Sequence, residues 1–186
     1  RRSGAFRHVL AFPSLETKAA FRTIYYEGEA AFALMRLHEI SGEERWLAAV
    51  ERAFGHFIAS GHWKHHDHWL AYCANELTRV RPKDEYFRFA LRNVADYLDF
   101  VANRITIPTL LELMTATREI VQRIDGLPQF RHLLAELDLA RFESALEKRA
   151  RYLLNGHFWP EFAMFFRNPE RIEGSFFIRH HAFRVR

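Results

Sequence analysis

Apolar and polar residues alternate along this chain in a pattern that repeats after forty positions. Apolar residues recur every three or four positions from about Tyr25 to Ile40, and again from about Glu43 to Ser60, which predicts two helices. A shift of 40 matches these stretches with about His68 to Val80 and about Lys83 to Val101. Such a period, with two amphipathic segments per unit, is typical of stacked helical hairpins, because one hairpin cannot bury its apolar face alone.

The same spacing predicts which side chains face the core. In the first helix the apolar stripe is Tyr26, Ala30, Ala33, Leu34 and Leu37, and in the second it is Trp46, Ala49, Val50, Ala53, Phe54, Phe57 and Ile58. Two further helices, from about Thr109 to Ile124 and from about Leu139 to Leu154, predict a third hairpin.

The periodic pattern divides the chain into three parts. Residues 1–23 are expected to be an irregular lead-in, and residues 24–154 to be three helical hairpins of one all-α domain. Residues 155–186 are rich in Phe and interrupted by Pro160, Pro169 and Gly174, which predicts an irregular tail packed on the repeats through its aromatic rings. Because Arg1 is no initiator Met and the chain stops without a turn or cap, we expect a fragment of a longer chain.

Composition excludes several classes of protein. Lys and Arg exceed Asp and Glu by 27 to 23, and this small excess is concentrated at the two ends rather than in a basic patch, so we expect no nucleic-acid partner. No apolar run reaches the ~20 residues of a membrane span. The single cysteine, Cys73, excludes an internal disulfide framework and fits a reducing compartment, which predicts a cytoplasmic location.

Motifs at the head of each hairpin carry a family resemblance. Tyr25-Tyr26-Glu27-Gly28-Glu29, followed by Ser41-Gly42-Glu43-Glu44-Arg45-Trp46, and the later Asp67-His68-Trp69-Leu70 are similar to hairpin units of the (α/α) toroid in the six-hairpin glycosidase and sugar-epimerase-like superfamily. The resemblance covers about residues 24–154, or roughly half the hairpins of a closed toroid. It implies that the first helix of each hairpin lines a central funnel, that the second helix lies outside, and that the loops before the inner helices meet at one mouth.

Under this toroid geometry, one rim gathers the candidate site residues Tyr26, Glu27, His66, Asp67, His68, Trp69, Glu112 and Arg118. Glu27 and Asp67 are the candidate catalytic pair, because glycoside chemistry uses one carboxyl group as an acid and a second as a base or nucleophile. The other six are candidate substrate-binding residues. Since Glu27 and Asp67 occupy equivalent positions of adjacent repeats, we expect them to be neighbours that raise each other's pKa if sheltered.

A purely structural interpretation of the same residues stays open. Asp67 caps a helix in that interpretation, Glu27 pairs with Arg118 or a nearby His, and Tyr26 and Trp69 are packing residues. The histidines of the segment Gly61 to Trp69 lack the i, i+4 spacing of a helical metal site, so no metal is predicted. No phosphate-binding glycine loop is present in the sequence, and no cofactor is predicted.

The sequence predicts two alternative functions, which belong to different functional classes. The first is a carbohydrate-active or sugar-binding domain, glycoside hydrolase-like if it is an enzyme, whose partner is a carbohydrate or another polar small ligand. The alternative is a noncatalytic helical-repeat module that binds a peptide or a partner domain of the same parent chain. The residues leave open whether the domain is an enzyme.

Overall fold

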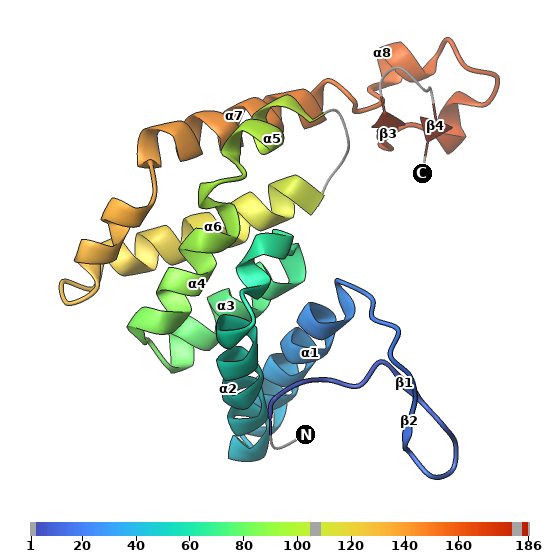
Figure 1. Ribbon diagram of the computed structural model, residues 1–186. Helices are drawn as coiled ribbons and strands as arrows, with labels where there is room; N and C mark the ends of the chain where they lie inside the picture. The colour runs from blue at the N-terminus through green and yellow to red at the C-terminus, as the bar shows by residue number, and fades with distance from the viewer. Residues whose placement is uncertain (1–2, 105–108, 180–183, 186) are drawn as a thin grey trace.

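The computed structural model describes residues 3–104, 109–179 and 184–185, and within them the chain is mostly helical (Figure 1). Helices account for 66% of the structure and strands for 4%, which confirms the predicted all-α class. None of the described helices combines the length and the hydrophobicity that crossing a bilayer requires.

Three helical hairpins form the body of the molecule, as the repeat predicts. The first consists of α1 (Tyr26–Ser41) and α2 (Glu44–Ala59), the second of α3 (His68–Val80) and α4 (Asp84–Ala95), and the third of α6 (Thr109–Asp125) and α7 (Leu139–Leu154). Short helical turns lie between them: η1 (His62–His65), α5 (Leu98–Asn103) and η2 (Arg131–Glu136). The starts of α2 and α4, at Glu44 and Asp84, stand at the predicted shift of 40.

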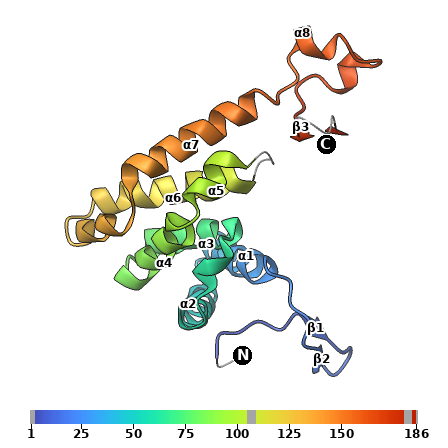
Figure 2. The ribbon, with the colours of Figure 1, turned by 45° about the horizontal axis from the view of Figure 1, so that its top comes forward.

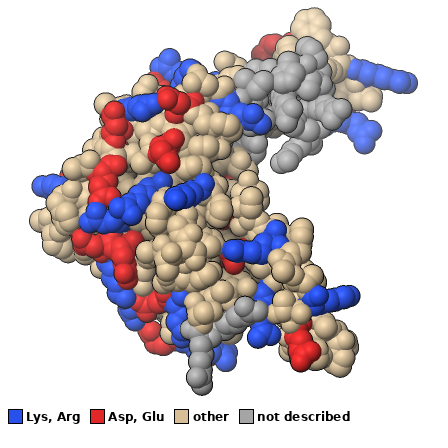
Figure 3. All heavy atoms as spheres, in the orientation of Figure 1, with Lys and Arg blue, Asp and Glu red and all other residues tan. Residues whose placement is uncertain are grey.

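The first helices of the hairpins lie side by side. The helix α3 packs between α1 and α6, while α2 and α4 pack behind α1 and α3 (Figures 1 and 2). The second helix of the third hairpin, α7, lies along both α5 and α6. In the space-filling view the molecule curves around a hollow between the lead-in and the tail (Figure 3).

The lead-in and the tail contain small elements of their own. The strands β1 (Val9–Leu10) and β2 (Thr17–Ala19) form an antiparallel ribbon, so the lead-in is less irregular than predicted. The tail contains α8 (Pro160–Ala163), η3 (Pro169–Arg171) and the antiparallel strands β3 (Phe177–Arg179) and β4 (Arg184–Val185). Phe158 is fully buried against Phe162 and Phe166, so the tail has a small core beyond the end of α7, rather than forming a layer over the hairpins (Figures 1 and 2).

The core follows the predicted stripe of α2 but not that of α1. In α2, Val50, Ala53, Phe54 and Phe57 are buried, whereas Trp46 is only half-buried under the guanidinium of Arg45.

The helix α1 instead buries Glu27, Gly28, Ala31 and Met35, and it leaves the predicted Leu37 exposed. The stripe was predicted one position off because two of the residues that face the interior are a charged residue and a glycine.

The predicted helix from Lys83 to Val101 is interrupted. It ends at Ala95, and α5 begins at Leu98. The ring of Tyr97 stacks on His66 with the centroids 3.9 Å apart, and its backbone N–H donates to the carbonyl of Val94 instead of continuing the α-helical pattern. This contact lets the chain turn, so that α5 runs beside α7.

Gly28 sets the distance between α1 and α3. A Cβ atom at this position would lie 2.3 Å from Oδ2 of Asp67 and 2.9 Å from the backbone N of Leu70, both closer than real Cβ contacts. The backbone of α1 therefore approaches the first turn of α3 to a distance that only glycine permits.

We predict that Gly28→Ala lowers the free energy of unfolding by about 2 kcal/mol, because the added methyl group forces the two helices apart. The matched control is Gly55→Ala in the interior of α2, where a Cβ would meet nothing within 4 Å. That change is expected to stabilise the protein by ~0.5–1 kcal/mol through helix propensity. Urea unfolding measures both variants, and equal effects of the two substitutions would contradict the close approach.

Candidate functional site

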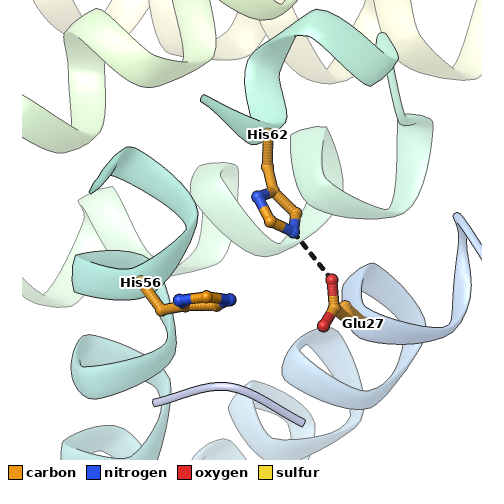
Figure 4. Close-up of side chains that lie close together, drawn as sticks. All are labelled: Glu27, His56 and His62. Carbon is orange, nitrogen blue, oxygen red and sulfur yellow. Dashed lines mark hydrogen bonds and ion pairs between the residues drawn. The ribbon is translucent and has the colours of Figure 1, made fainter. Parts of the chain in front are cut away.

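Glu27 lies at the centre of a buried polar network at the start of α1. Its side chain is 4% exposed, and its Oε2 lies 2.8 Å from Nε2 of His62. Arg22 donates to the same oxygen, and Nε2 of His8 lies 3.4 Å from Oε1. Figure 4 shows His62 directed at the carboxylate from the turn above it. Oε2 of Glu27 is thus bound within the protein, and Oε1 faces the ring of His8.

The turn after α2 and two separate segments of the lead-in contribute these partners. His62 begins η1, which follows α2 after a turn at Gly61, whose φ of 67° suits glycine. Arg22 belongs to the segment between β2 and α1. His8 comes from the lead-in, where its Nδ1 accepts a hydrogen bond from the backbone N–H of Thr23. The lead-in therefore closes over the first turn of α1.

The network keeps Glu27 ionised. Burial by itself raises the pKa of this carboxyl group, but the hydrogen bond from His62, the charge of Arg22 and the hydrogen bond from His8 outweigh it and lower the pKa to about 2. Glu27 is therefore a carboxylate throughout the neutral range, and it is poorly suited to donate a proton there.

His56 adds a second imidazole to this network from the last turn of α2. Its ring centroid lies 5.4 Å from that of His62, and one of its ring nitrogens is turned toward Glu27 (Figure 4). Burial and the neighbouring His62 lower the pKa of His56. One ligand atom from each of Glu27, His56 and His62 lies within 4.8 Å of the others, a spacing at which these residues could hold a metal ion.

Asp67 caps α3 as predicted. Its Oδ1 accepts from the backbone N–H of Trp69 at 2.9 Å, and its own backbone is bound through the side-chain amide of Asn93. The side chain is fully buried and Oδ2, which faces Gly28, has no hydrogen-bond partner among the described residues. Burial raises the pKa of Asp67 to about 7, against the effect of the hydrogen bonds from the Trp69 and Leu70 backbone.

The two predicted catalytic carboxyl groups thus occupy different environments. Both are buried, as expected for a sheltered pair. However, Glu27 is bound to the guanidinium of Arg22 and to the imidazole of His62, and Asp67 is bound to a backbone amide. The pKa of Glu27 is lowered, where the sequence predicted that Asp67 would raise it. The structural interpretation of Glu27 was right in naming a nearby histidine, but Arg118 is not its partner.

Three of the predicted substrate-binding residues lie together on α3 and α6. Nε2 of His68 is 3.5 Å from Oε2 of Glu112, and the His68 ring lies 5.1 Å from that of Trp69. Trp69 in turn contacts Tyr72 at 5.9 Å. The ring centroid of Tyr25 lies 5.6 Å from that of His68, and the ring of Phe32 stacks on Tyr72 with the centroids 5.6 Å apart. These rings form a continuous group, here called the inner aromatic cluster (Tyr25, Phe32, His68, Trp69 and Tyr72).

The remaining three candidates lie elsewhere. Tyr26 is 38% exposed and packs on His8. His66 stacks on Tyr97 as described above, and its Nδ1 contacts the backbone carbonyl of Asn93 at 2.9 Å. Arg118 pairs with Glu143 at 3.3 Å and lines a groove of about 650 Å³ between α6 and α7. The rim predicted from the repeat is therefore split into several local environments.

The sequence reasoning missed His8, Arg22 and His56. The first two lie in the lead-in, where no periodic pattern relates them to Glu27. His56 and His62 stand six positions apart across the end of a helix, which matches no standard ligand spacing. The only available signal was the abundance of histidine on both sides of Gly61.

We predict that Glu27→Gln lowers the free energy of unfolding at pH 7 by about 3 kcal/mol, because the pKa of Glu27 is far below its ordinary value of 4.5. The lowered pKa gives stability that is present above pH 4.5 and is lost as the pH falls toward 2, so the difference between the variant and wild type should shrink over that window. Urea unfolding across this range measures it. The exposed Glu29→Gln is the control, and an equally small effect of both substitutions would contradict the network.

Asp67→Asn is expected to have the opposite dependence on pH. A raised pKa means that folded Asp67 holds its proton between pH 3.8 and 7 while the unfolded chain has lost it, so wild-type stability falls as the pH rises through this window. Asn retains the capping oxygen and does not titrate. The variant should therefore gain about 4 kcal/mol on wild type between pH 4 and 8. A constant difference, measured by urea unfolding, would show that Asp67 is solvated.

The chain has no match among protein-family models, curated proteins or solved structures. The resemblance to six-hairpin toroids stays a prediction. The structure itself offers two groups of side chains: the polar network around Glu27, and the inner aromatic cluster, whose His68 lies next to Glu112.

Proposed function

We propose that the inner face of the three hairpins binds a carbohydrate, as an arc of an (α/α) toroid would. The observation that carries the proposal is the inner aromatic cluster, which joins side chains of α1 and α3 where the first helices of the hairpins lie side by side. Aromatic faces suit the apolar faces of sugar rings, while hydroxyl groups need polar partners at the edge of such a platform.

The inner aromatic cluster offers aromatic faces, and polar groups lie at its edge. Trp69 and Tyr72 stand on the face of α3 that stays half-exposed, between neighbours on the helix that are buried. Glu112 borders the cluster beside His68, and the charge of Glu29 also acts on His68. These carboxylates, rather than Glu27, are placed to accept hydrogen bonds from sugar hydroxyl groups. Burial lowers the pKa of His68, which keeps its ring neutral and able both to donate and to accept.

The positions of the two carboxyl groups favour carbohydrate binding without hydrolysis. Arg22 and His62 bind Oε2 of Glu27, His8 lies 3.4 Å from Oε1, and Asp67 is fully buried at the α1–α3 contact. A retaining or inverting glycosidase needs two carboxyl groups that reach the same glycosidic bond. The predicted pair would have to leave its present partners to do so.

The alternative function, a noncatalytic module that binds a partner domain, has one observation in its favour. Charged residues along the inner helices are paired with each other: Arg36 lies 3.7 Å from Glu76, and Arg79 lies 2.7 Å from Glu119. Such pairing leaves fewer free polar groups for a small ligand. The two functions differ in whether the aromatic cluster responds to saccharides.

We predict that Trp69→Ala weakens saccharide binding about tenfold or more, because it removes the largest ring of the platform. Saturation-transfer NMR with a panel of neutral, amino and acidic oligosaccharides identifies a ligand, and calorimetry then measures its affinity. The matched control is Trp46→Ala, which removes a half-buried indole on α2, outside the cluster.

Two outcomes would count against the proposal. Saccharide binding that Trp69→Ala and Trp46→Ala reduce equally would place the ligand elsewhere. No response of the wild-type chain to any oligosaccharide of the panel would favour the interaction module instead.

A further inference from the structure

Three potential metal ligands converge from three elements at the Glu27 network. Glu27 comes from the first turn of α1, His56 from the last turn of α2, and His62 from the start of η1. One ligand atom of each lies within 4.8 Å of the others, and Figure 4 shows the three side chains facing a common point. Glu27 and His62 are buried and His56 is half-buried, so the point is sheltered but can be reached past His56.

The contacts at Nε2 of His62 conflict with each other. This nitrogen lies 2.8 Å from Oε2 of Glu27 and 3.0 Å from Nη2 of Arg22. A carboxylate only accepts hydrogen bonds and a guanidinium only donates them. If Nε2 carries a proton it faces the donor of Arg22, and if it does not, its lone pair faces the oxygen of Glu27. A cation bound to both Oε2 and Nε2 removes the conflict.

We infer that Glu27, His56 and His62 form a binding site for a divalent transition-metal ion, and that the guanidinium of Arg22 competes with the ion for this site. Two imidazoles and one carboxylate make up the protein ligands of a known class of zinc sites, which leave one position open. The same donors also suit other first-row divalent ions. This inference is independent of saccharide binding by the inner aromatic cluster.

The required movement is small. Zinc binds nitrogen and oxygen at 2.0–2.2 Å, so donors around a tetrahedral ion stand about 3.4 Å apart. The ligand atoms are already within 4.8 Å of one another, and side-chain rotation at the last turn of α2 closes the remainder. Nδ1 of His56 lies 3.4 Å from Oγ of Ser60, and when the Nδ1 proton is donated to that hydroxyl oxygen, the Nε2 lone pair of His56 is left for the ion.

His8 supports the site without being a ligand. Its Nδ1 accepts the backbone N–H of Thr23 at 3.0 Å, so its proton is on Nε2 when the ring is neutral. Nε2 faces Oε1 of Glu27 at 3.4 Å. With Oε1 facing His8, Oε2 is the oxygen left for the ion, and a neighbour of this kind commonly orients a metal-binding carboxylate.

The side chain of Arg22 is free to move away from Glu27 and His62 when an ion binds. Its side chain is 54% exposed, and it belongs to the segment between β2 and α1, which has no regular secondary structure. It places one positive charge on the same atoms, Oε2 of Glu27 and Nε2 of His62, that the ion needs. Two cations cannot share them, so binding of the ion should free Arg22 and its segment.

The experiment uses the chain without a histidine tag, treated with EDTA and dialysed. Calorimetry with ZnCl₂ measures stoichiometry and affinity, and the visible absorption of Co²⁺ reports the coordination geometry. We expect one ion per chain and a cobalt spectrum of tetrahedral type. His56→Ala should weaken zinc binding by about 100-fold or more, because it removes one ligand. His132→Ala, which removes an exposed histidine outside the network, should leave the affinity unchanged.

The variant Arg22→Ala tests whether the guanidinium of Arg22 competes with the metal ion for the site. The inference predicts that this variant binds zinc about tenfold more tightly, and that zinc makes the 20–25 segment of the wild-type chain more susceptible to limited trypsin cleavage at Arg22. Circular dichroism of the EDTA-treated variants checks that each is folded. Weaker zinc binding by Arg22→Ala, wild-type affinity in His56→Ala, or no binding by the wild-type chain would each overturn the inference.

Discussion

The close approach of α1 and α3 at Gly28 is the constraint on which the arrangement of both functional groups depends. Because Gly28 has no side chain, the capping carboxyl group of Asp67 can lie directly against α1. That contact turns Glu27, one position earlier, toward η1 and the lead-in, where His62 and Arg22 meet it. It also brings Phe32 within reach of the rings on α3. The absence of a side chain at Gly28 thus allows the polar network around Glu27 and the inner aromatic cluster to form on either side of the same helix contact.

The hairpins were predictable because their signals are local. Amphipathic spacing, Gly42 after α1 and the capping Asp67 before α3 all act within a few residues, and the repeat adds the pairing of helices. The rotation of α1 was not predictable, since a hydrophobicity pattern does not place a charged residue and a glycine in a core. The break before α5 was missed for a similar reason: it depends on Tyr97 stacking on His66, a contact between distant parts of the chain.

The candidate site was predictable only in outline. Equivalent repeat positions correctly located Glu27 and Asp67 at adjacent helix starts, and both are buried. Their partners could not be derived, because Arg22 lies in a lead-in without periodicity and His62 reaches Glu27 across 35 positions. The same repeat position therefore holds a carboxylate stabilised by Arg22 and His62 in one hairpin and a buried helix-capping carboxyl group in the next. Equivalent repeat positions therefore predict where the two carboxyl groups lie, but not which charges and hydrogen bonds surround them.

The most direct test of this account is an NMR titration of the carboxyl carbons of Glu27 and Asp67 in the intact, EDTA-treated chain. We expect two independent transitions, with a pKa of about 2 for Glu27 and of about 7 for Asp67. Each would reflect its own neighbours, cations for Glu27 and a desolvated helix contact for Asp67. If both groups titrate together, with both pKa values raised, the two carboxyl groups share a proton as a catalytic pair does, and the separation described here is contradicted.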